Sequence, residues 1–194
     1  MTGGAVDRKP IAAGKSSFEI VDTDKVLAEL ELEKGPVLVD AACGAGNYTI
    51  TAAPLMAAGG HIHAFDLWRE GIEELSSRIR ERRLGNVTVA VADISKEIPL
   101  ADGSADVCLI ATALHDLIED GGGEGTLRQV ARILRPGGRL VVLEFVKEEG
   151  PPGPPLRIRL SPEELDDFVT PFGFEKVRTT GAGEHFYLST YVRS

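Results

Sequence analysis

The chain has 194 residues, 43% of them hydrophobic, which is enough apolar material for the core of one domain. Its formal net charge of −9 disfavours nucleic acid as a partner, because such a surface needs a basic stripe to displace counterions. The apolar runs are too short to span a membrane, and the N-terminus lacks the apolar stretch of a secretory signal.

The same features give a simple domain plan. We expect residues 1–17 to be a flexible lead-in and residues 18–194 to form a single domain. Cys43 and Cys108 lie inside apolar runs and suggest no disulfide framework, which is typical of the reducing cytoplasm. The sequence leaves the oligomeric state open.

Strand-like and helix-like segments alternate through most of this domain. Helical patterns occur at residues 22–35 and 48–58 and around Ile72, Leu75 and Ile79. Short apolar runs predict strands at residues 36–40, 61–66, 86–93, 105–112 and 137–145. The alternation indicates an α/β fold in which helices cover both faces of a mostly parallel sheet.

The C-terminal part follows a different pattern. Leu127, Val130, Ala131 and Leu134 predict one face of a helix that ends before Pro136. A second helix is expected to begin at a capping box made by Ser161 and Glu164. Residues 174–180 and 185–192 then read as two strands separated by only four residues. Because that gap is too short for a parallel crossover, these two strands must be antiparallel.

Acidic residues end three of the first four predicted strands or lie beside their ends. A strand-end aspartate is often only a turn former, but ligands of open α/β sheets bind beyond the carboxyl ends of the strands. Asp66 lies 22 residues beyond Gly44, about where an acid binds the ribose hydroxyls of a nucleoside. Asp93 is placed to accept from a base, with apolar surface from Leu67 and Ile94.

The turn after the first strand favours a cationic ligand. Gly44 and Gly46 permit a tight turn and a close approach of the ligand, while the charge of Asp40 would repel a pyrophosphate and attract an ammonium or sulfonium group. The third glycine of the dinucleotide-binding pattern would fall at Thr49, so that pattern is not met.

Four segments together resemble the motifs of one family. "VLVDAACGAGNYT" (37–49), "HAFDLW" (63–68), "VAVADI" (89–94) and "LRQVARILRPGGRLVVLEF" (127–145) occur in its order. The chain resembles the class I, Rossmann-like S-adenosylmethionine-dependent methyltransferases over residues 18–194. Among them it is similar to the small-molecule enzymes of the ubiquinone and menaquinone biosynthesis type. Ala42 departs from the pattern, since many members have glycine there.

This resemblance implies a doubly wound, seven-stranded sheet whose antiparallel seventh strand lies between the fifth and sixth. It also implies S-adenosylmethionine as the methyl donor, no metal, and a small-molecule acceptor that receives the methyl group by in-line displacement. With the strand-end argument it gives one predicted set of cofactor-binding residues. The set is Asp40, Ala42, Cys43, Gly44, Gly46, Asp66, Leu67, Asp93, Ile94 and Thr112.

His115, just past the fourth strand, is the candidate catalytic base, with Asp116 to orient it. The alternative is that His115 shapes a pocket wall or caps the next segment. His61 and His63 share a strand face, but no third ligand lies at a metal-binding spacing. Lys147, Arg157 and Arg159 are interpreted as solvated charges rather than as contacts for an anionic substrate.

Two other function classes fit parts of the sequence. A non-catalytic protein that binds S-adenosylmethionine is compatible with every motif, because methyl transfer requires no unique side chain. A nicotinamide-dependent oxidoreductase or epimerase fits less well. It lacks the third glycine and a Tyr-x-x-x-Lys proton donor.

Overall fold

The computed structural model describes residues 13–14 and 16–194. Most of the expected lead-in, residues 1–17, lies outside the described residues. Within that part, a seven-stranded sheet has the strand order β3-β2-β1-β4-β5-β7-β6. The strands are β1 (Val37–Ala41), β2 (His61–Asp66), β3 (Val87–Val91), β4 (Ala105–Ala111), β5 (Leu134–Phe145), β6 (Phe174–Gly181) and β7 (Phe186–Arg193).

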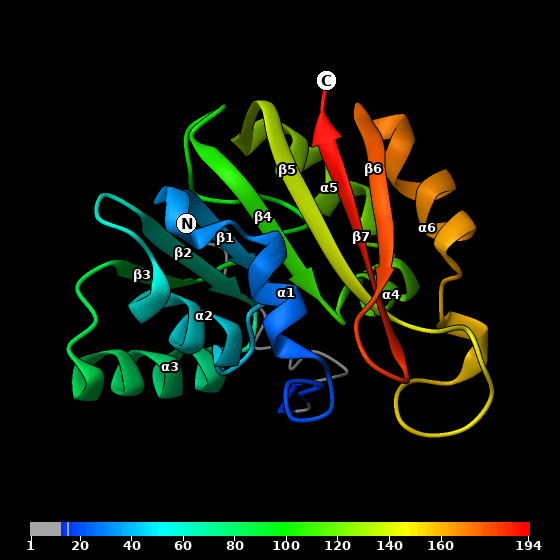
Figure 1. Ribbon diagram of the computed structural model, residues 1–194, viewed down its shortest axis with the longest axis horizontal. Helices are drawn as coiled ribbons and strands as arrows, with labels where there is room; N and C mark the ends of the chain where they lie inside the picture. The colour runs from blue at the N-terminus through cyan, green and yellow to red at the C-terminus, as the bar shows by residue number, and fades with distance from the viewer. Residues whose placement is uncertain (1–12, 15) are drawn as a thin grey trace, which may run out of the picture.

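The expected antiparallel C-terminal strand is confirmed. β7 pairs antiparallel with both β5 and β6, while β1, β2, β3, β4 and β5 pair parallel with one another. Strand β7 therefore lies between β5 and β6, as the resemblance implied (Figure 1). The parallel strands place their carboxyl ends at the same end of the sheet, and the predicted site residues lie at this end.

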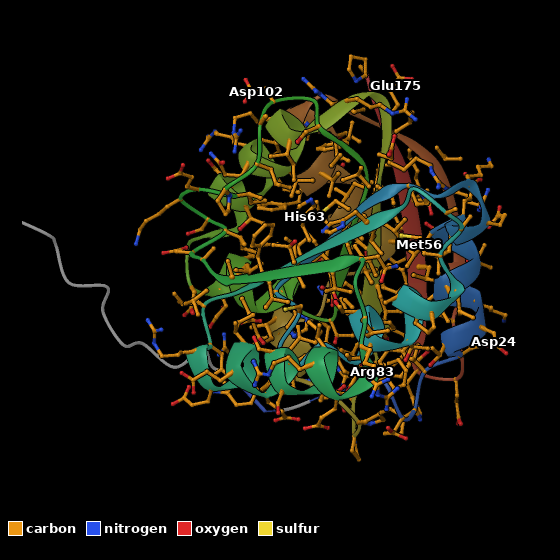
Figure 2. All side chains as sticks on the ribbon, turned by 90° about the vertical axis from the view of Figure 1, so that its left-hand side faces the viewer. Asp24, Met56, His63, Arg83, Asp102 and Glu175 are labelled. Atoms are coloured by element: carbon orange, nitrogen blue, oxygen red, sulfur yellow. The ribbon has the colours of Figure 1, made fainter. Side chains whose placement is uncertain are left out.

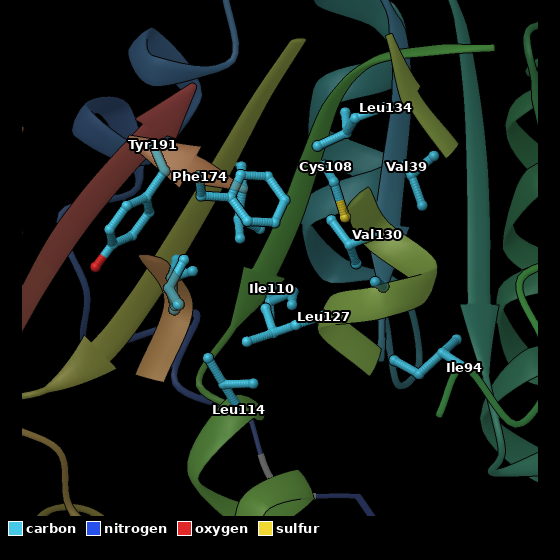
Figure 3. Close-up of a cluster of buried hydrophobic side chains, with 14 of the residues drawn as sticks. Val39, Ile94, Cys108, Ile110, Leu114, Leu127, Val130, Leu134, Phe174 and Tyr191 are labelled. Carbon is cyan, nitrogen blue, oxygen red and sulfur yellow. The ribbon is translucent and has the colours of Figure 1, made fainter. Parts of the chain in front are cut away.

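Helices cover both faces of the sheet (Figure 1). They are α1 (Thr23–Glu29), α2 (Asn47–Ala52), α3 (Arg69–Arg82), α4 (Leu114–Glu119), α5 (Gly123–Ile133) and α6 (Pro162–Val169). Alternate strand residues point to opposite faces, so the core divides into separate clusters. Leu38 and Leu109 pack with α1 and α2, whereas Val39 and Ile110 pack with α4, α5 and α6. Figure 3 shows the second cluster, in which Leu127 of α5 lies against Ile110.

The β3 edge of the sheet is flanked by α3, whose end is marked by Arg83 in Figure 2. Arg83 caps α3 with a left-handed backbone, two residues before Gly85. His63, also labelled in Figure 2, lies on β2 next to this edge. No helix in the described part of the chain combines the length and the apolar character needed to cross a membrane.

Several helix boundaries differ from the sequence expectation. The helix expected at 22–35 ends at Glu29, because Glu31 adopts a left-handed backbone and a 3-10 turn, Leu32–Lys34, follows. The helix expected at 48–58 ends at Ala52 and continues as a 3-10 turn, Ala53–Leu55, around Pro54. The capping box of Ser161 and Glu164 is confirmed.

The fifth strand also begins earlier than expected. Leu134 belongs to β5 and pairs with Ala105 of β4, so it is not part of the helix face to which we assigned it. It is nonetheless fully buried. The short helix α4 was not anticipated, because six residues are too few to show a helical period.

Candidate functional site

Two neighbouring cavities lie at the carboxyl ends of the parallel strands. The first has a volume of about 160 Å³ and the second of about 260 Å³. They share part of their lining, including Gly44, Trp68 and Thr112. Every residue of the predicted cofactor-binding set lines at least one of the two. The structure thus brings together residues from four different strand ends.

The turn after β1 uses its small residues for different reasons. Gly44 and Gly46 have φ of 56° and 75°, a left-handed backbone that glycine adopts without strain. A Cβ on Gly46 would lie 2.3 Å from the Leu75 side chain, so this glycine is required for packing against α3. A Cβ on Gly44 would meet no protein atom within 4 Å, which leaves room for a ligand at that point.

Ala42 is the position at which the family pattern often has glycine. Its φ is 61°, so an L-residue is held in the left-handed region here. Cys43, next to it, donates its backbone N–H to the Phe65 carbonyl, 3.0 Å away. Burial and the charges of Asp40 and Asp66 raise the pKa of the Cys43 thiol well above its ordinary value, so the thiol stays protonated.

Helix α3 holds this turn from outside. Arg78 donates to the Ala45 carbonyl at 2.6 Å and to Asn47 Oδ1 at 3.0 Å. Together with the packing of Leu75 against Gly46, these bonds fix the backbone that lines the second cavity. This role of Arg78 was not anticipated from the sequence, because it depends on a contact between α3 and a turn 31 to 33 residues earlier.

Asp66 ends β2 and its side chain is buried. Its Oδ2 accepts from the Gly44 N–H at 2.7 Å, and its Oδ1 accepts from the Trp68 N–H at 2.7 Å. Each carboxylate oxygen has a further lone pair, so these bonds leave acceptor capacity toward the first cavity. Burial raises the pKa of Asp66, and the backbone N–H groups partly oppose that rise.

Asp93, beyond β3, combines a structural role with a place in the first cavity. Its Oδ1 accepts from the Ser95 N–H and hydroxyl, and its Oδ2 pairs with Lys96 Nζ at 2.7 Å. Burial raises its pKa, but the hydrogen bonds from Lys96 and Ser95 outweigh burial, so the pKa lies below its ordinary value and the group is ionised. Ile94, which is buried, and Leu67 supply apolar surface in the same cavity.

Asp40, in β1, is the most deeply buried of the three acids at 2% exposed. Its Oδ2 accepts from Thr49 Oγ1 at 2.6 Å. Burial raises the pKa of Asp40 to about 6, with a further contribution from the charge of Asp66, while Thr49 lowers it. Because Asp40 lines the second cavity, a cation bound there would restore its charge.

Three hydroxyl groups in the second cavity were not found from the sequence as a group. Ser17 and Thr112 contact each other, with 3.0 Å between Oγ and Oγ1. Thr112 has a φ of 50°, which is rare for a β-branched residue and marks a strained position. Tyr48 lines the same cavity, and its buried hydroxyl has no hydrogen-bond partner among the described residues.

His115 lies in the first turn of α4 and is 3% exposed. Its Nδ1 is 2.7 Å from Glu144 Oε2, and its backbone N–H donates to Glu144 Oε1 at 3.2 Å. Asp116, which we expected to orient the ring, instead lies 3.6 Å from Nε2. His115 lines neither cavity, whereas Asp116 lines the first. The orienting carboxylate is therefore Glu144. It lies 29 residues from His115 in the sequence, so no local pattern predicts this pair.

Several causes act on the pKa of His115. Burial lowers it, but the hydrogen bond and the charge of Glu144, with a contribution from Asp116, raise it above its ordinary value. The positive charge of Arg159 opposes that rise. The imidazole is thus held by a fully buried carboxylate on one side and has a second acid near its other nitrogen.

The basic residues after β5 act within the protein. Arg159 is 4% exposed and donates to the carbonyls of Val146, Gly150, Pro152 and Pro154, so it organises the proline-rich loop. The expectation of a solvated charge is wrong for Arg159, since these carbonyls replace water around it. Lys147 pairs with Glu164, and Arg157 pairs with Glu119.

The histidines of β2 have local partners. The rings of His61 and His63 lie 4.7 Å apart, and His61 Nε2 is 2.8 Å from Thr88 Oγ1. Within the described residues, no three His, Cys, Asp or Glu side chains are grouped so as to hold a metal ion.

The comparisons with known proteins agree with this geometry. A family model described as a methyltransferase domain matches residues 32–168. This range begins before β1 and ends in α6, so it includes all the strand ends that line the cavities. The chain belongs to this methyltransferase domain family.

Curated relatives of this methyltransferase domain act on different acceptors. The ubiquinone/menaquinone biosynthesis C-methyltransferase UbiE of Ectopseudomonas mendocina is 31% identical over 82% of this chain and 59% of that protein. The 27-O-demethylrifamycin SV methyltransferase of Amycolatopsis mediterranei is 32% identical over 68% of this chain and 46% of that protein. The chain thus spans only about half of the length of the curated relatives that it matches.

Solved structures support the fold of the methyltransferase domain over nearly its whole length. The SAM-dependent methyltransferase of Aquifex aeolicus has a TM-score of 0.82 and 26% identity, and the match covers 93% of this chain and 94% of that one. The [4+2]-cyclase SpnF, at 20% identity and a TM-score of 0.73, shares the fold; the match covers 88% of this chain and 79% of that one. A cyclase among the neighbours shows that this fold alone does not fix the reaction.

Proposed function

We propose that this protein transfers a methyl group from S-adenosylmethionine to a small-molecule acceptor. The observation that carries the proposal is the pair of cavities at the carboxyl ends of β1 to β4, lined by Asp40, Asp66 and Asp93 in strand order. Membership in the methyltransferase domain family and the likeness to a solved SAM-dependent methyltransferase support the same conclusion.

The residues present fit the methyl donor in three respects. The first cavity combines apolar walls with Asp93, which suits a nucleobase, and Asp66 stands at the boundary with acceptor capacity for ribose hydroxyls. The open space above Gly44 allows the ligand to pass between the cavities. The buried Asp40 in the second cavity suits the cationic end of the donor.

The remaining residues of the predicted set form the walls around these contacts. We assign Ala42, Cys43 and Gly46 to the backbone turn that lies along the bound methyl donor. Thr112 is assigned to the boundary between the donor site and the acceptor site. When bound, S-adenosylmethionine supplies a methyl group already activated on a sulfonium. The protein then has to orient the acceptor and exclude water, and proximity alone can supply several kcal/mol.

His115 is proposed as the proton acceptor for substrates whose nucleophile must lose a proton; because it lines neither cavity itself, the proton would reach it through Asp116. Glu144 fixes its Nδ1–H and leaves Nε2 directed toward Asp116, which lines the first cavity. Because the pKa of His115 is raised, the imidazole becomes neutral and able to accept a proton only at a pH above its ordinary pKa. Base-assisted methyl transfer should therefore increase with pH. No metal takes part in the proposed reaction.

The protein's setting is part of the same proposal. We take residues 18–194 as a single catalytic domain and a quinone-like or other small aromatic molecule as the acceptor, because curated relatives include a ubiquinone/menaquinone methyltransferase. The free cysteines Cys43 and Cys108 are consistent with a cytoplasmic location. Nucleic acid remains disfavoured by the net charge of −9.

The direct test is calorimetric titration with S-adenosylhomocysteine, the product of the methyl donor. We expect the wild-type protein to bind and the Gly44→Ala variant to lose most of that affinity, because the added methyl would stand in the open space between the cavities. Gly137→Ala is the matched control, since Gly137 has a φ of 75° and open space but does not line either cavity. Absence of binding by the wild type would overturn the proposal.

A further inference from the structure

Tyr48 is the one described residue whose buried side-chain polar atom lacks a hydrogen bond. Its side chain is 8% exposed and its ring packs edge-on against Phe18, with 5.1 Å between the centroids. A buried hydroxyl without a partner is costly, so native structures rarely contain one unless a ligand or water supplies the bond. This hydroxyl therefore points to something that binds in the second cavity.

The groups around the Tyr48 hydroxyl define what it can bind. Burial and the charge of Asp40 raise the pKa of Tyr48, and the nearby Ser17 partly opposes that rise. The phenol is therefore protonated at every physiological pH and acts as a donor. Ser17 lies close enough to Tyr48 to lower its pKa, but no hydrogen bond of normal geometry joins the two hydroxyls, and Ser17 is paired with Thr112, 3.0 Å away. Tyr48 therefore keeps its proton for another acceptor.

The hydroxyl pair of Ser17 and Thr112 adds a second donor. The two hydroxyls have two protons, and the bond between them uses only one. The other proton can be donated to a ligand in the second cavity, which both residues line. Tyr48 and this pair therefore offer two neutral donors, which matches the two oxygens of a carboxylate.

The charges of the cavity suit an amino-acid group with both signs of charge. Its described acids are Asp40 and Glu74, and no described Lys or Arg lines it. An ammonium group is attracted to Asp40, whereas a carboxylate has to be held by neutral donors. The nucleoside of the donor is assigned to the first cavity, so the second cavity receives the methionine portion.

We propose that Tyr48, with the Ser17–Thr112 hydroxyl pair, binds the carboxylate of the methionine portion of the methyl donor. This inference rests on the proposed function. It gives the N-terminal segment a role in cofactor binding, because Ser17 precedes α1 and reaches the cavity from outside the sheet. In Figure 1 that segment lies below the arrowhead of β4, at the same end of the sheet.

The experiment compares three ligands by calorimetry. S-adenosylhomocysteine carries the whole amino-acid tail, its decarboxylated analogue keeps only the ammonium, and 5′-methylthioadenosine lacks both groups. We expect Tyr48→Phe to weaken binding of S-adenosylhomocysteine about tenfold or more, as for a hydrogen bond to a charged group. Binding of the other two ligands should stay within about twofold of the wild type.

The same variant should be more stable without ligand. Removing an unsatisfied buried hydroxyl is favourable, so we expect the melting temperature of the ligand-free Tyr48→Phe protein to rise by about 2–4 °C. Tyr187→Phe is the control: its buried hydroxyl bonds to the Leu160 carbonyl, away from both cavities. It should leave the affinity for S-adenosylhomocysteine unchanged. Ser17→Ala should repeat the ligand selectivity of Tyr48→Phe with a smaller loss.

Four outcomes would overturn the inference. Unchanged binding of S-adenosylhomocysteine by Tyr48→Phe would show that the hydroxyl meets only water. An equal loss on 5′-methylthioadenosine would show an effect on the nucleoside or the fold. A loss shared with the decarboxylated analogue but not with 5′-methylthioadenosine would assign the hydroxyl to the ammonium. Failure of the wild type to bind S-adenosylhomocysteine would overturn the proposed function as well.

Discussion

The carboxyl ends of β1 to β3 and those of β4 and β5 use acidic residues in opposite ways. Asp40, Asp66 and Asp93 line the cavities and keep acceptor capacity for a ligand. Glu144 of β5 is fully buried, and both of its oxygens are taken by His115. An acid at a strand end is thus no sign of binding by itself. What distinguishes the two groups is whether the carboxylate lines a cavity: Asp40, Asp66 and Asp93 do, and Glu144 does not.

The largest expected effect concerns Glu144, the strand-end acid that pairs with His115. Glu144→Ala should lower the free energy of unfolding by about 3–5 kcal/mol, because it leaves His115 buried without its partner. Urea unfolding followed by circular dichroism measures the change. Asp93→Ala, at the partly exposed acid of the first cavity, should cost clearly less. Equal losses for the two variants would remove the distinction between the two regions.

For Asp40, an acid that lines a cavity, we expect substitution to stabilise the ligand-free protein rather than destabilise it. Because burial raises the pKa of Asp40 to about 6, its charge is unfavourable in the folded protein above that pH. Asp40→Asn should therefore stabilise the ligand-free protein by about 2–3 kcal/mol at pH 7.5. Near pH 4 the carboxyl is largely protonated in the folded state, so the gain should almost vanish.

Urea unfolding of the wild type and Asp40→Asn at the two pH values measures this difference. The variant should also bind S-adenosylmethionine more weakly, since the ligand's cation loses its counter-charge. A variant that is less stable at pH 7.5 than the wild type would mean that Asp40 serves the fold rather than the ligand.

A smaller effect concerns the pH dependence of the His115–Glu144 pair. The folded pKa of His115 is raised, so its contribution to stability is complete below the unfolded pKa and is lost as pH rises through the folded value. The stability difference between wild type and His115→Asn should accordingly shrink with increasing pH. Unfolding curves at several pH values from 5.5 to about 8.5 measure it, around the ordinary pKa of about 6.5. A difference that grows with pH would show that burial, not Glu144, controls the imidazole.

The smallest expected effect concerns Ala42. Glycine relieves the left-handed backbone at φ 61°, a gain of about 1–2 kcal/mol, but costs about 0.5–1 kcal/mol of chain entropy. Ala42→Gly should thus raise the free energy of unfolding by about 0.5 kcal/mol and leave the affinity for S-adenosylhomocysteine nearly unchanged. Thermal unfolding and calorimetry measure the two quantities. A clear loss of affinity would mean that the Ala42 methyl contacts the ligand.

The sequence predicted most of the fold because the strong signals were local. The continuous apolar runs located β1 to β5, and the four-residue gap before β7 required an antiparallel pair. The missed helix α4 is a single short segment, and the early end of α1 depends on the backbone of Glu31. Such boundaries are set by tertiary packing rather than by a local pattern.

Site residues could be predicted from the sequence only where their position in a single strand or turn indicated their role. Asp40, Asp66 and Asp93 could be found because each ends a strand of the same sheet. The pairing of His115 with Glu144, the contact of Ser17 with Thr112 and the role of Arg159 join residues from separate segments. No spacing in the sequence encodes these contacts, so they emerge only from the packed structure.

A crystal structure of the protein with S-adenosylhomocysteine tests the central claim most directly. We expect the base beside Asp93 and Ile94, the ribose on Asp66, and the amino-acid tail in the cavity lined by Asp40 and Tyr48. A nucleoside bound away from the ends of β1, β2 and β3 would contradict it.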